Sequence, residues 1–260
     1  MLETEITRVD VPSRKASKVN DCVAEEKPLY IFLDRNHYAT IFCSPSNLKE
    51  LTTGYLLAEG IVKSVDEIDE MNLNIDEFIC RVKLKSNNNT ARRQRFSRHF
   101  SRVIRSACGS PSPYQFSGKL PKVESRLTVE AETILRCVSR LNFSAELFRK
   151  TGGVHVAAIY HGEDVEALAE DVGRHNAVDK VIGIGALNRT DLSACFLALS
   201  GRLTGEIVFK AARAGIPIVA SLAAAIDSGI TMARDTGLTL VGFVRGNRMN
   251  IYSYPERILW

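Results

Sequence analysis

Long apolar runs and an N-terminal targeting pattern are both missing from this 260-residue chain. The longest nearly apolar run, residues 218–226, is far short of the roughly 20 residues that a membrane helix needs. The first five residues include Glu3 and Glu5, and they lack the apolar core of a secretory signal. The sequence therefore predicts a soluble, cytoplasmic protein that does not enter a membrane.

Paired cysteine motifs are also missing, because the cysteines are dispersed as Cys22, Cys43, Cys80, Cys108, Cys137 and Cys195. This spacing argues against a disulfide framework and against a structural zinc site, so we expect free thiols and no bound metal. Four of these cysteines lie in strand-like, helical or apolar runs that predict buried structural side chains: Cys43, Cys80, Cys137 and Cys195. Cys108 differs, because its neighbours are Ser, Gly and Pro.

Acidic residues are absent from residues 81–105, although basic ones are frequent there. The basic residues are Arg81, Lys83, Lys85, Arg92, Arg93, Arg95, Arg98, Arg102 and Arg105. A dense block of one sign repels itself unless an anion offsets it, so the block is either a solvated face or an anion-binding surface. It leads directly to Cys108, and cationic neighbours lower the pKa of a thiol. A reactive thiol beside phosphate-binding arginines is a coherent site.

The second half of the chain alternates strand-like and helical patterns, which predicts an α/β layer with at least partly parallel strands. The expected strands are 154–160, 195–199, 216–220, 238–244 and 250–254, and the expected helices are 177–187, 203–214 and 223–235. In the first half we expect a loose arm or edge strand at 1–26, a hairpin of 29–33 with 38–43, a helix at 48–58 capped by Asn47, a strand at 78–85 and a helix at 127–141.

The chain is accordingly divided into three parts. Residues 1–106 form a smaller mixed α/β part that includes the basic segment 81–105. Residues 107–120 form a mobile loop that carries Cys108, because Gly109 and the prolines oppose regular structure. Residues 121–260 form the α/β core.

Residues 170–180 (EDVGRHNAVDK) are unusually dense in groups that can titrate or bind a ligand. Asn176 can cap a helix, and His175 and Asp179 share a helix face if the helix already includes His175. Helix capping with surface ion pairs is one interpretation of this segment. A binding site is the other, because capping does not require Arg, His, Asn, Asp and Lys together.

Three shorter motifs are weaker signals. Gly152 and Gly153 precede a strand that begins near His155, which by itself is typical of a core histidine. Ser200-Gly201-Arg202 stands between a strand and a helix, where backbone amides can bind a phosphate. Gly246-Asn247 predicts a hairpin turn whose flanking arginines either bind a phosphate or are merely exposed.

Together these segments resemble the FdhD family of sulfur carriers, which are required for formate dehydrogenase activity. The resemblance extends in order from about Pro28 to the end of the chain. It rests on residues 51–61 (LTTGYLLAEGI), Cys108-Gly109, 151–155 (TGGVH), 170–180, 200–202 (SGR) and 242–245 (GFVR). The segment 171–180 is the most specific of them.

The resemblance implies a function, a fold and partners. The family takes sulfur from a cysteine desulfurase as a cysteine persulfide and delivers it to the molybdenum bis-guanine-dinucleotide cofactor of formate dehydrogenase. That cofactor is a client, so no permanent cofactor is expected. A cytidine deaminase-like α/β core and a homodimer are also implied.

The implied persulfide residue is Cys108. The implied cofactor-binding stretch is Phe243, Val244, Arg245, Gly246, Asn247 and Arg248. We expect the other polar motifs to line the same site, through Gly153, His155, Arg174, His175, Asp179, Lys180, Ser200 and Arg202.

One feature of the cysteine loop departs from the family. The family usually shows C-G-x-C-G, whereas residues 108–112 read CGSPS, so the second cysteine is missing. A noncatalytic chaperone that binds the molybdenum cofactor is therefore the main alternative. A zinc deaminase is disfavoured because His155 is not followed by the glutamate of His-x-Glu, and no P-C-x-x-C is present. A nucleic-acid module is disfavoured because only Phe96 and Phe100 interrupt the basic block.

Overall fold

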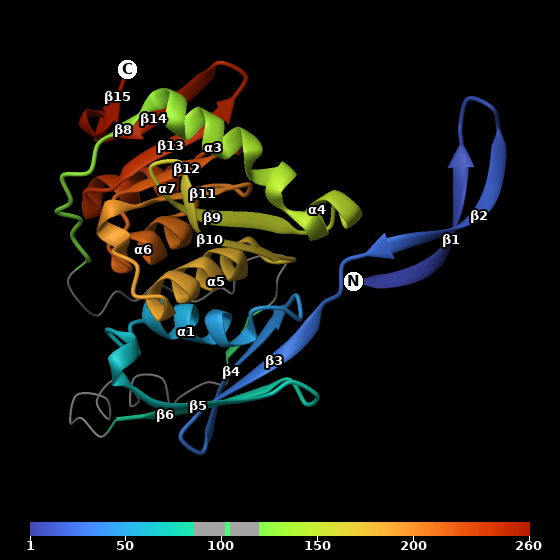
Figure 1. The fold of residues 1–260 in the computed structure, drawn as a ribbon, viewed down its shortest axis with the longest axis horizontal. Helices are drawn as coiled ribbons and strands as arrows, with labels where there is room; N and C mark the ends of the chain where they lie inside the picture. Colours follow the sequence, from blue (N-terminus) through green and yellow to red (C-terminus); the bar gives the residue numbers. More distant parts are fainter. Residues whose placement is uncertain (86–101, 105–119) are drawn as a thin grey trace.

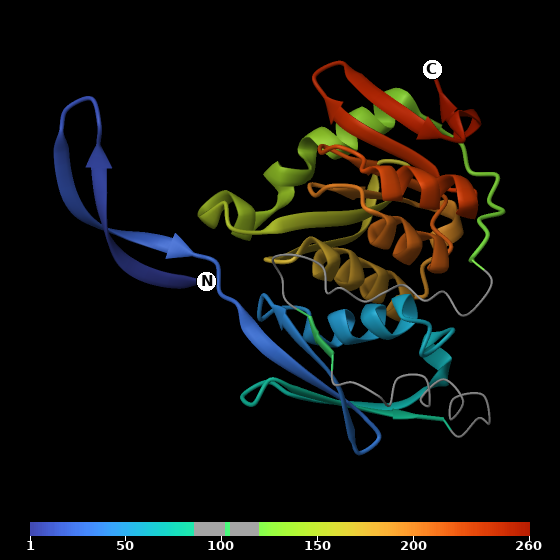
Figure 2. The same ribbon diagram turned by 180° about the vertical axis from the view of Figure 1, so that it is seen from behind.

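The computed structural model describes residues 1–85, 102–104 and 120–260. Its first element is a two-stranded antiparallel ribbon, made of β1 (Leu2–Asp10) and β2 (Lys15–Val23). Figures 1 and 2 show this ribbon standing clear of the rest of the molecule. Leu2 pairs with Val23 and Ile6 with Val19, so apolar side chains gather on one ribbon face. The loose arm or edge strand expected at 1–26 is therefore a hairpin.

A smaller layer follows the ribbon and consists of a five-stranded sheet covered by one helix. The sheet order is β5-β6-β3-β4-β7. The strands are β3 (Lys27–Leu33), β4 (Asn36–Cys43), β5 (Ile68–Asn74), β6 (Ile79–Leu84) and β7 (Arg102–Ile104). Helix α1 (Leu48–Ala58) packs its apolar face on this sheet, and the short helix η1 (Val65–Glu67) follows it. The core between them includes Leu29, Ile31, Leu51 and Leu56, all fully buried.

The main layer is a six-stranded sheet in the order β10-β9-β11-β12-β13-β14. Its strands are β9 (His155–His161), β10 (Asp164–Asp171), β11 (Phe196–Leu199), β12 (Ile218–Ser221), β13 (Thr239–Arg245) and β14 (Arg248–Ser253). Strand β12 is parallel to both β11 and β13, whereas the other neighbours are antiparallel. The expected α/β class with partly parallel strands is confirmed.

Helices cover both faces of this sheet (Figures 1 and 2). Helices α5 (Arg174–Leu187), α6 (Gly205–Arg213) and α7 (Asp227–Thr236) pack on one face, and α3 (Ala131–Ser144) packs on the other. Successive residues of β11 alternate between the two cores, as a strand buried on both faces requires. The remaining short elements are α4 (Glu146–Thr151), η2 (Leu192–Ala194), η3 (Pro255–Arg257) and the pair β8 (Val129–Glu130) with β15 (Ile258–Leu259).

The two layers meet where α1 lies against α5 (Figure 1), and two glycines allow their backbones to touch. A Cβ added at Gly54 would lie 1.8 Å from the carbonyl oxygen of Asp179. One added at Gly183 would lie 1.9 Å from the carbonyl oxygen of Glu50. Side chains cannot be accommodated at such distances, so these two positions fix how closely the helices approach.

Several local expectations are wrong. The sequence patterns missed β5 and β10; the buried positions of β10 are Ala167, Ala169 and Asp171, a set with little apolar signal. Helices α3, α6 and α7 begin four, two and four residues later than expected, at 131, 205 and 227. Asn47 has a left-handed backbone (φ 51°), and its side chain makes no capping hydrogen bond.

Within the described residues, no helix is long and apolar enough to cross a membrane.

Replacing Gly183 by Ala is expected to destabilise the protein by about 1–3 kcal/mol, because the new methyl group meets the backbone of α1. Gly185→Ala is the matched control, since its Cβ would meet side chains and no backbone: the end of the flexible Leu192 side chain at 2.8 Å and that of Ile159 at 3.6 Å. Denaturant unfolding of both variants measures the difference. Equal stability of the two variants would contradict the close helix contact.

Candidate functional site

The parallel strands β11, β12 and β13 end at one edge of the main sheet, which is where ligands bind in open α/β sheets. Ser200 follows β11 at this edge, and the turn between β13 and β14 lies at the same edge. Strand β9 runs antiparallel to β11, so its first residue, His155, also lies there. Several of the motifs are therefore brought to one sheet edge (Figure 1).

His155, Arg174 and Ser200 form the centre of this edge. The Ser200 hydroxyl accepts a hydrogen bond from the Val156 N–H (3.0 Å) and lies 3.4 Å from His155 Nδ1. A Cβ at Gly201 would lie 3.0 Å from the Arg174 Cβ and 3.5 Å from His155 Nδ1. Gly201 thus lets the first residue of α5 approach the end of β11, which the sequence motif alone did not show.

The surroundings of His155 lower its pKa, which favours the neutral imidazole. Burial lowers its pKa most, and the positive charge of Arg174 lowers it further. His175 and Arg202 act in the same direction, while Asp171 opposes them. A neutral, half-buried histidine among cations can exchange hydrogen bonds with a bound anion without adding to the net charge.

His175, the next residue of α5, is paired with an acid that the sequence motifs did not single out. Its Nε2 lies 2.9 Å from a carboxylate oxygen of Glu206, in the first turn of α6. The side chains are 14% and 24% exposed, respectively. Burial lowers the pKa of His175, the Glu206 carboxylate raises it, and Lys210 and Arg174 lower it. The only sequence signal for Glu206 was its place at the start of the helix after Ser200-Gly201-Arg202.

Asp171 and Lys180 form a completely buried ion pair behind this edge. The Lys180 ammonium lies 2.7 Å from Asp171 and donates to the carbonyls of Ser44 (3.2 Å) and Glu170 (3.0 Å). Asp171 also accepts from the N–H groups of Ser44 (3.0 Å) and Gly173 (2.8 Å). The hydrogen-bond partners of this ion pair named above are therefore all groups of the protein itself.

Asn176 belongs to the same network and is not the N-cap that the sequence predicted. Gly173 occupies the N-cap position of α5, and Asn176 lies inside the first turn. The Asn176 amide donates to the Phe42 carbonyl and to Asp171, at 2.9 Å each. Because these partners lie in β4 and β10, the Asn176 side chain connects both strands to α5.

Asp179 forms a second buried pair, with Lys210 of α6 at 2.7 Å. The Lys210 ammonium also lies 5.6 Å from the centre of the Tyr55 ring. Burial raises the pKa of Asp179 to about 6, although the charge of Lys210 opposes this shift. Since Asp179 and Lys180 are sealed inside the protein, we expect them to position α5 and not to touch a ligand themselves.

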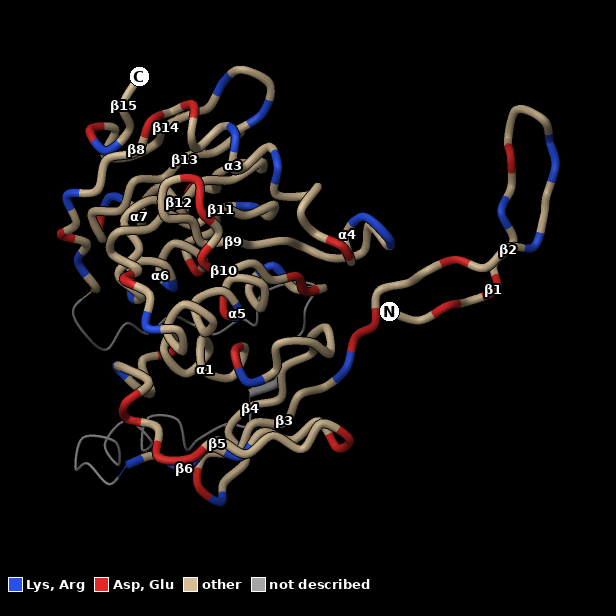
Figure 3. The backbone as a smooth tube through the Cα atoms, viewed as in Figure 1, with Lys and Arg blue, Asp and Glu red and all other residues tan. Residues whose placement is uncertain are grey.

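The predicted cofactor-binding stretch forms the β13–β14 hairpin. Gly246 adopts φ 61° in the turn, as the Gly-Asn motif predicted. Arg245 and Arg248 are exposed at its tip, and the Arg245 guanidinium lies 5.1 Å from the Phe243 ring centre. Figure 3 shows the colour of basic residues on this hairpin turn. Asn247 is exposed beside them, whereas Val244 is buried in the core under α3.

The remaining residues predicted for the site are either exposed or lie outside the part of the chain that the structure describes. Gly153 is exposed in the turn before β9, and Arg202 is exposed after β11. Cys108, the loop 107–119 and most of the basic segment lie outside the described residues. The four cysteines expected to be structural are buried: Cys43, Cys80, Cys137 and Cys195. Burial raises the pKa of all four thiols, that of Cys43 to about 12.

Asp171→Asn is expected to destabilise the protein by about 3–5 kcal/mol, because it leaves the Lys180 charge buried without its counter-ion. The double variant Asp171→Leu/Lys180→Met should recover part of that loss, since it removes both charges. Asp69→Asn, which breaks the exposed pair with Lys83, is the control and should change the unfolding midpoint little. A loss in Asp171→Asn no greater than in the control would contradict the role of the buried pair.

Comparison with known proteins agrees with this architecture. The sequence model of the FdhD/NarQ family matches residues 24–259. The sulfur carrier protein FdhD of Methanothermobacter thermautotrophicus is 39% identical over 99% of this chain and 98% of its own length. That of Staphylococcus haemolyticus is 33% identical over 93% of this chain and 91% of its own length.

A solved structure is similar to this protein in its three-dimensional fold as well. It is described as a candidate formate dehydrogenase accessory protein from Desulfotalea psychrophila. The alignment has a TM-score of 0.81 at 26% identity and covers 99% of both chains. With nearly the whole chain matched by family model, relatives and structure, the protein belongs to the FdhD/NarQ family.

Proposed function

We propose that this protein is a sulfur carrier that serves formate dehydrogenase. It would accept sulfur from a cysteine desulfurase as a persulfide on Cys108 and deliver it to the molybdenum bis-guanine-dinucleotide cofactor. The observation that carries the proposal is the convergence of His155, Arg174 and Ser200 at the carboxyl edge of the sheet. The relatives named sulfur carriers, similar over nearly the whole chain, support the same function.

The edge has the chemistry that a guanine dinucleotide requires. Arg202, Arg245 and Arg248 are exposed there, and a guanidinium binds phosphate oxygens in a bidentate manner. Arg174, like Arg202, acts on the charge of His155, and it lies at the N-terminus of α5, where the helix dipole also favours an anion. We propose that these arginines bind the pyrophosphate groups of the cofactor and that His155 donates or accepts one further hydrogen bond.

The sulfur step is a thiol exchange. The Cys108 thiolate attacks the outer sulfur of the desulfurase persulfide, a new S–S bond forms, and the desulfurase cysteine leaves as a thiolate. When the S–S bond breaks, Cys108 would leave as a thiolate with the electron pair of that bond, and the reduced metal of the client cofactor would supply the two electrons that convert the delivered sulfur into a sulfido ligand, so one cysteine is chemically sufficient. The four buried cysteines are poor candidates for this step because their pKa values are raised.

We also propose that the protein acts in the cytoplasm as a homodimer. The β1–β2 ribbon supports the dimer, because an isolated two-stranded hairpin is at best marginally stable in water. Leu2 is 57% exposed and Val23 36% exposed on the ribbon's apolar face. A second copy that covers this face would account for the ordered ribbon.

The alternative function is a cofactor-binding chaperone that carries no sulfur, since the second loop cysteine is missing.

Cys108→Ser is expected to abolish sulfur loading and formate dehydrogenase activity in cells that carry only this variant, because the serine hydroxyl cannot form a persulfide. Incubation with a desulfurase and cysteine, followed by mass spectrometry of the peptides, measures the loading. Cys22→Ser is the control, since Cys22 is the described cysteine that is not buried. Wild-type protein without added sulfur on Cys108, but with bound cofactor, would favour the chaperone.

Arg174→Ala and Arg202→Ala are each expected to weaken the binding of GDP, a fragment of the cofactor, by about tenfold, through loss of a charge-assisted hydrogen bond. Arg140→Ala is the matched control, because Arg140 is exposed on α3, which packs on the opposite face of the sheet from α5. Calorimetric titration measures the affinities. Unchanged affinity in both edge variants would place nucleotide binding elsewhere.

A further inference from the structure

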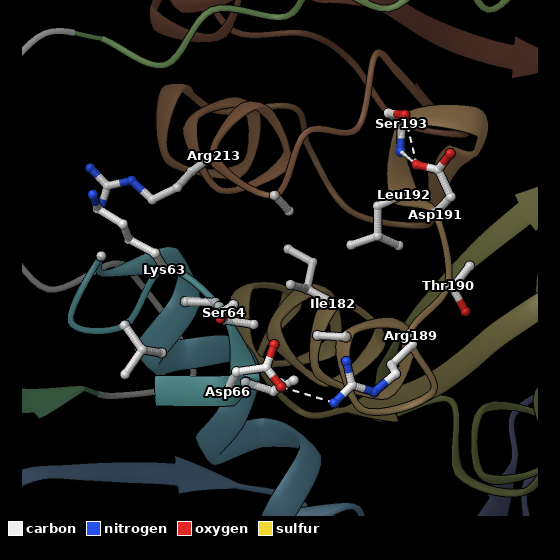
Figure 4. A pocket seen from close by; sticks show the side chains of 16 residues that line it. Lys63, Ser64, Asp66, Ile182, Arg189, Thr190, Asp191, Leu192, Ser193 and Arg213 are labelled. Carbon is white, nitrogen blue, oxygen red and sulfur yellow. Dashed lines mark hydrogen bonds and ion pairs between the residues drawn. The ribbon is translucent and has the colours of Figure 1, made fainter. Parts of the chain in front are cut away.

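A cavity of about 720 Å³ lies where the smaller layer meets the main one (Figure 4). Its walls come from the chain after α1, the C-terminal parts of α5 and α6, and the segment around η2. Its volume is within the usual range of roughly 300–1,000 Å³ for ligand pockets. None of the residues that line it belongs to the carboxyl-edge site.

The floor of this cavity is apolar. Ile182 and Leu192 point into its middle (Figure 4), and Leu57, Val62 and Ala186 contribute further apolar surface. Ile182 is 1% exposed and belongs to the main core, so it supports the floor from below, and the apolar surface that a partner can reach is that of the half-buried Leu57, Ala186 and Leu192. An apolar floor open to solvent is suited to an apolar anchor side chain of a partner.

One side of the cavity is cationic, with Lys63 and Arg213 next to each other (Figure 4). Arg213 is held in place: its Nη1 donates to the Ala58 carbonyl at 2.9 Å, and its guanidinium lies 4.3 Å from the Phe209 ring centre. Gly60 makes room for it, since a Cβ there would lie 2.5 Å from Arg213 Nη1. The Lys63 ammonium has no ion-pair or hydrogen-bond partner in the described part of the chain.

The acids around the cavity are already engaged. Asp66 pairs with Arg189 at 2.9 Å, on another side of the cavity from the two cations (Figure 4). Asp191 accepts from the Ser193 N–H (3.0 Å) and hydroxyl (2.7 Å). The charge left for a ligand is therefore that of Lys63, beside the fixed Arg213. An apolar group that carries a carboxylate nearby matches this arrangement.

The cavity and the carboxyl-edge site lie at opposite ends of α5. Arg174 begins the helix at the site, and Ala186 lies in its last turn at the cavity, about 18 Å away at 1.5 Å per residue. A formate dehydrogenase that receives sulfur has to reach the cofactor at the carboxyl edge. A sulfur donor that docks elsewhere on the surface does not compete with it.

We propose that this cavity docks the cysteine desulfurase, through an acidic segment of that enzyme with an apolar anchor. The anchor occupies the floor at Ala186 and Leu192, and the acid pairs with Lys63. The proposal rests on the proposed function, which requires a donor enzyme, and it adds the surface that the donor uses. Charge pairs at the rim of such a contact mainly set the association rate and its salt dependence.

The test compares two cavity variants with two matched controls, using the full chain and the purified desulfurase holoenzyme. Lys63→Glu reverses the free charge, and Ala186→Phe fills the floor. Arg140→Glu reverses an exposed charge on α3, and Leu187→Phe enlarges the neighbouring side chain on α5, which is 44% exposed and does not line the cavity. Biolayer interferometry measures desulfurase binding, and GDP affinity confirms that each variant is folded.

Lys63→Glu and Ala186→Phe are each expected to weaken desulfurase binding about tenfold or more, with GDP affinity unchanged. Both controls should remain within about twofold of the wild type. Chemical loading of Cys108 with inorganic polysulfide should be equal in all variants, because it bypasses docking.

Two results separate the docking proposal from the proposed function. Desulfurase binding that is undetectable in the wild type, or equal in the wild type and both cavity variants, overturns the docking site. Cavity-dependent binding without sulfur transfer to Cys108 supports the docking site and contradicts the sulfur-carrier function.

Discussion

Asp171 and Lys180 form an ion pair without exposed side-chain surface at the point where the two layers meet. Removing two charges from water costs several kcal/mol per ion, and this cost is offset only when other polar groups complete the geometry. Here the completing groups come from both layers, because Ser44 follows β4 in the smaller layer and Gly173 is the N-cap of α5 in the main one. The pair therefore stabilises one relative placement of the layers.

The glycine contacts between α1 and α5 constrain the same relative placement of the two layers. Gly54 and Gly183 allow backbone-to-backbone contact, which leaves little freedom to slide one helix along the other. With its middle fixed by α1 and its start fixed by Asp171, α5 presents Arg174 and His175 at a defined point of the sheet edge. The candidate site thus inherits its geometry from buried contacts that no ligand touches.

The sequence was sufficient for elements with a strong local signal, and insufficient where burial depends on distant partners. Except for β10, which was missed, the alternation of strands and helices after residue 154 was predicted correctly, as was the Gly246-Asn247 turn, because both signals are local. The roles inside residues 170–180 could not be separated from the sequence. Asp171 is matched by Ser44 and Asp179 by Lys210, and only the fold brings these partners together. Glu206 was missed for the same reason, since its partner His175 is 31 positions earlier.

The distribution of charge in the segment 170–180 explains how an acidic motif can serve an anionic ligand. Glu170 accepts hydrogen bonds from the N–H groups of Leu147 and Phe148, at the start of α4. Asp171 and Asp179 are neutralised by buried lysines. Each of these acids is thus paired or hydrogen-bonded within the protein. Arg174, the exposed arginine after β11 and those in the β13–β14 turn lie at the sheet edge. The edge is left with cationic groups because the acids of this segment are paired or hydrogen-bonded within the protein, and such an edge favours an anionic ligand.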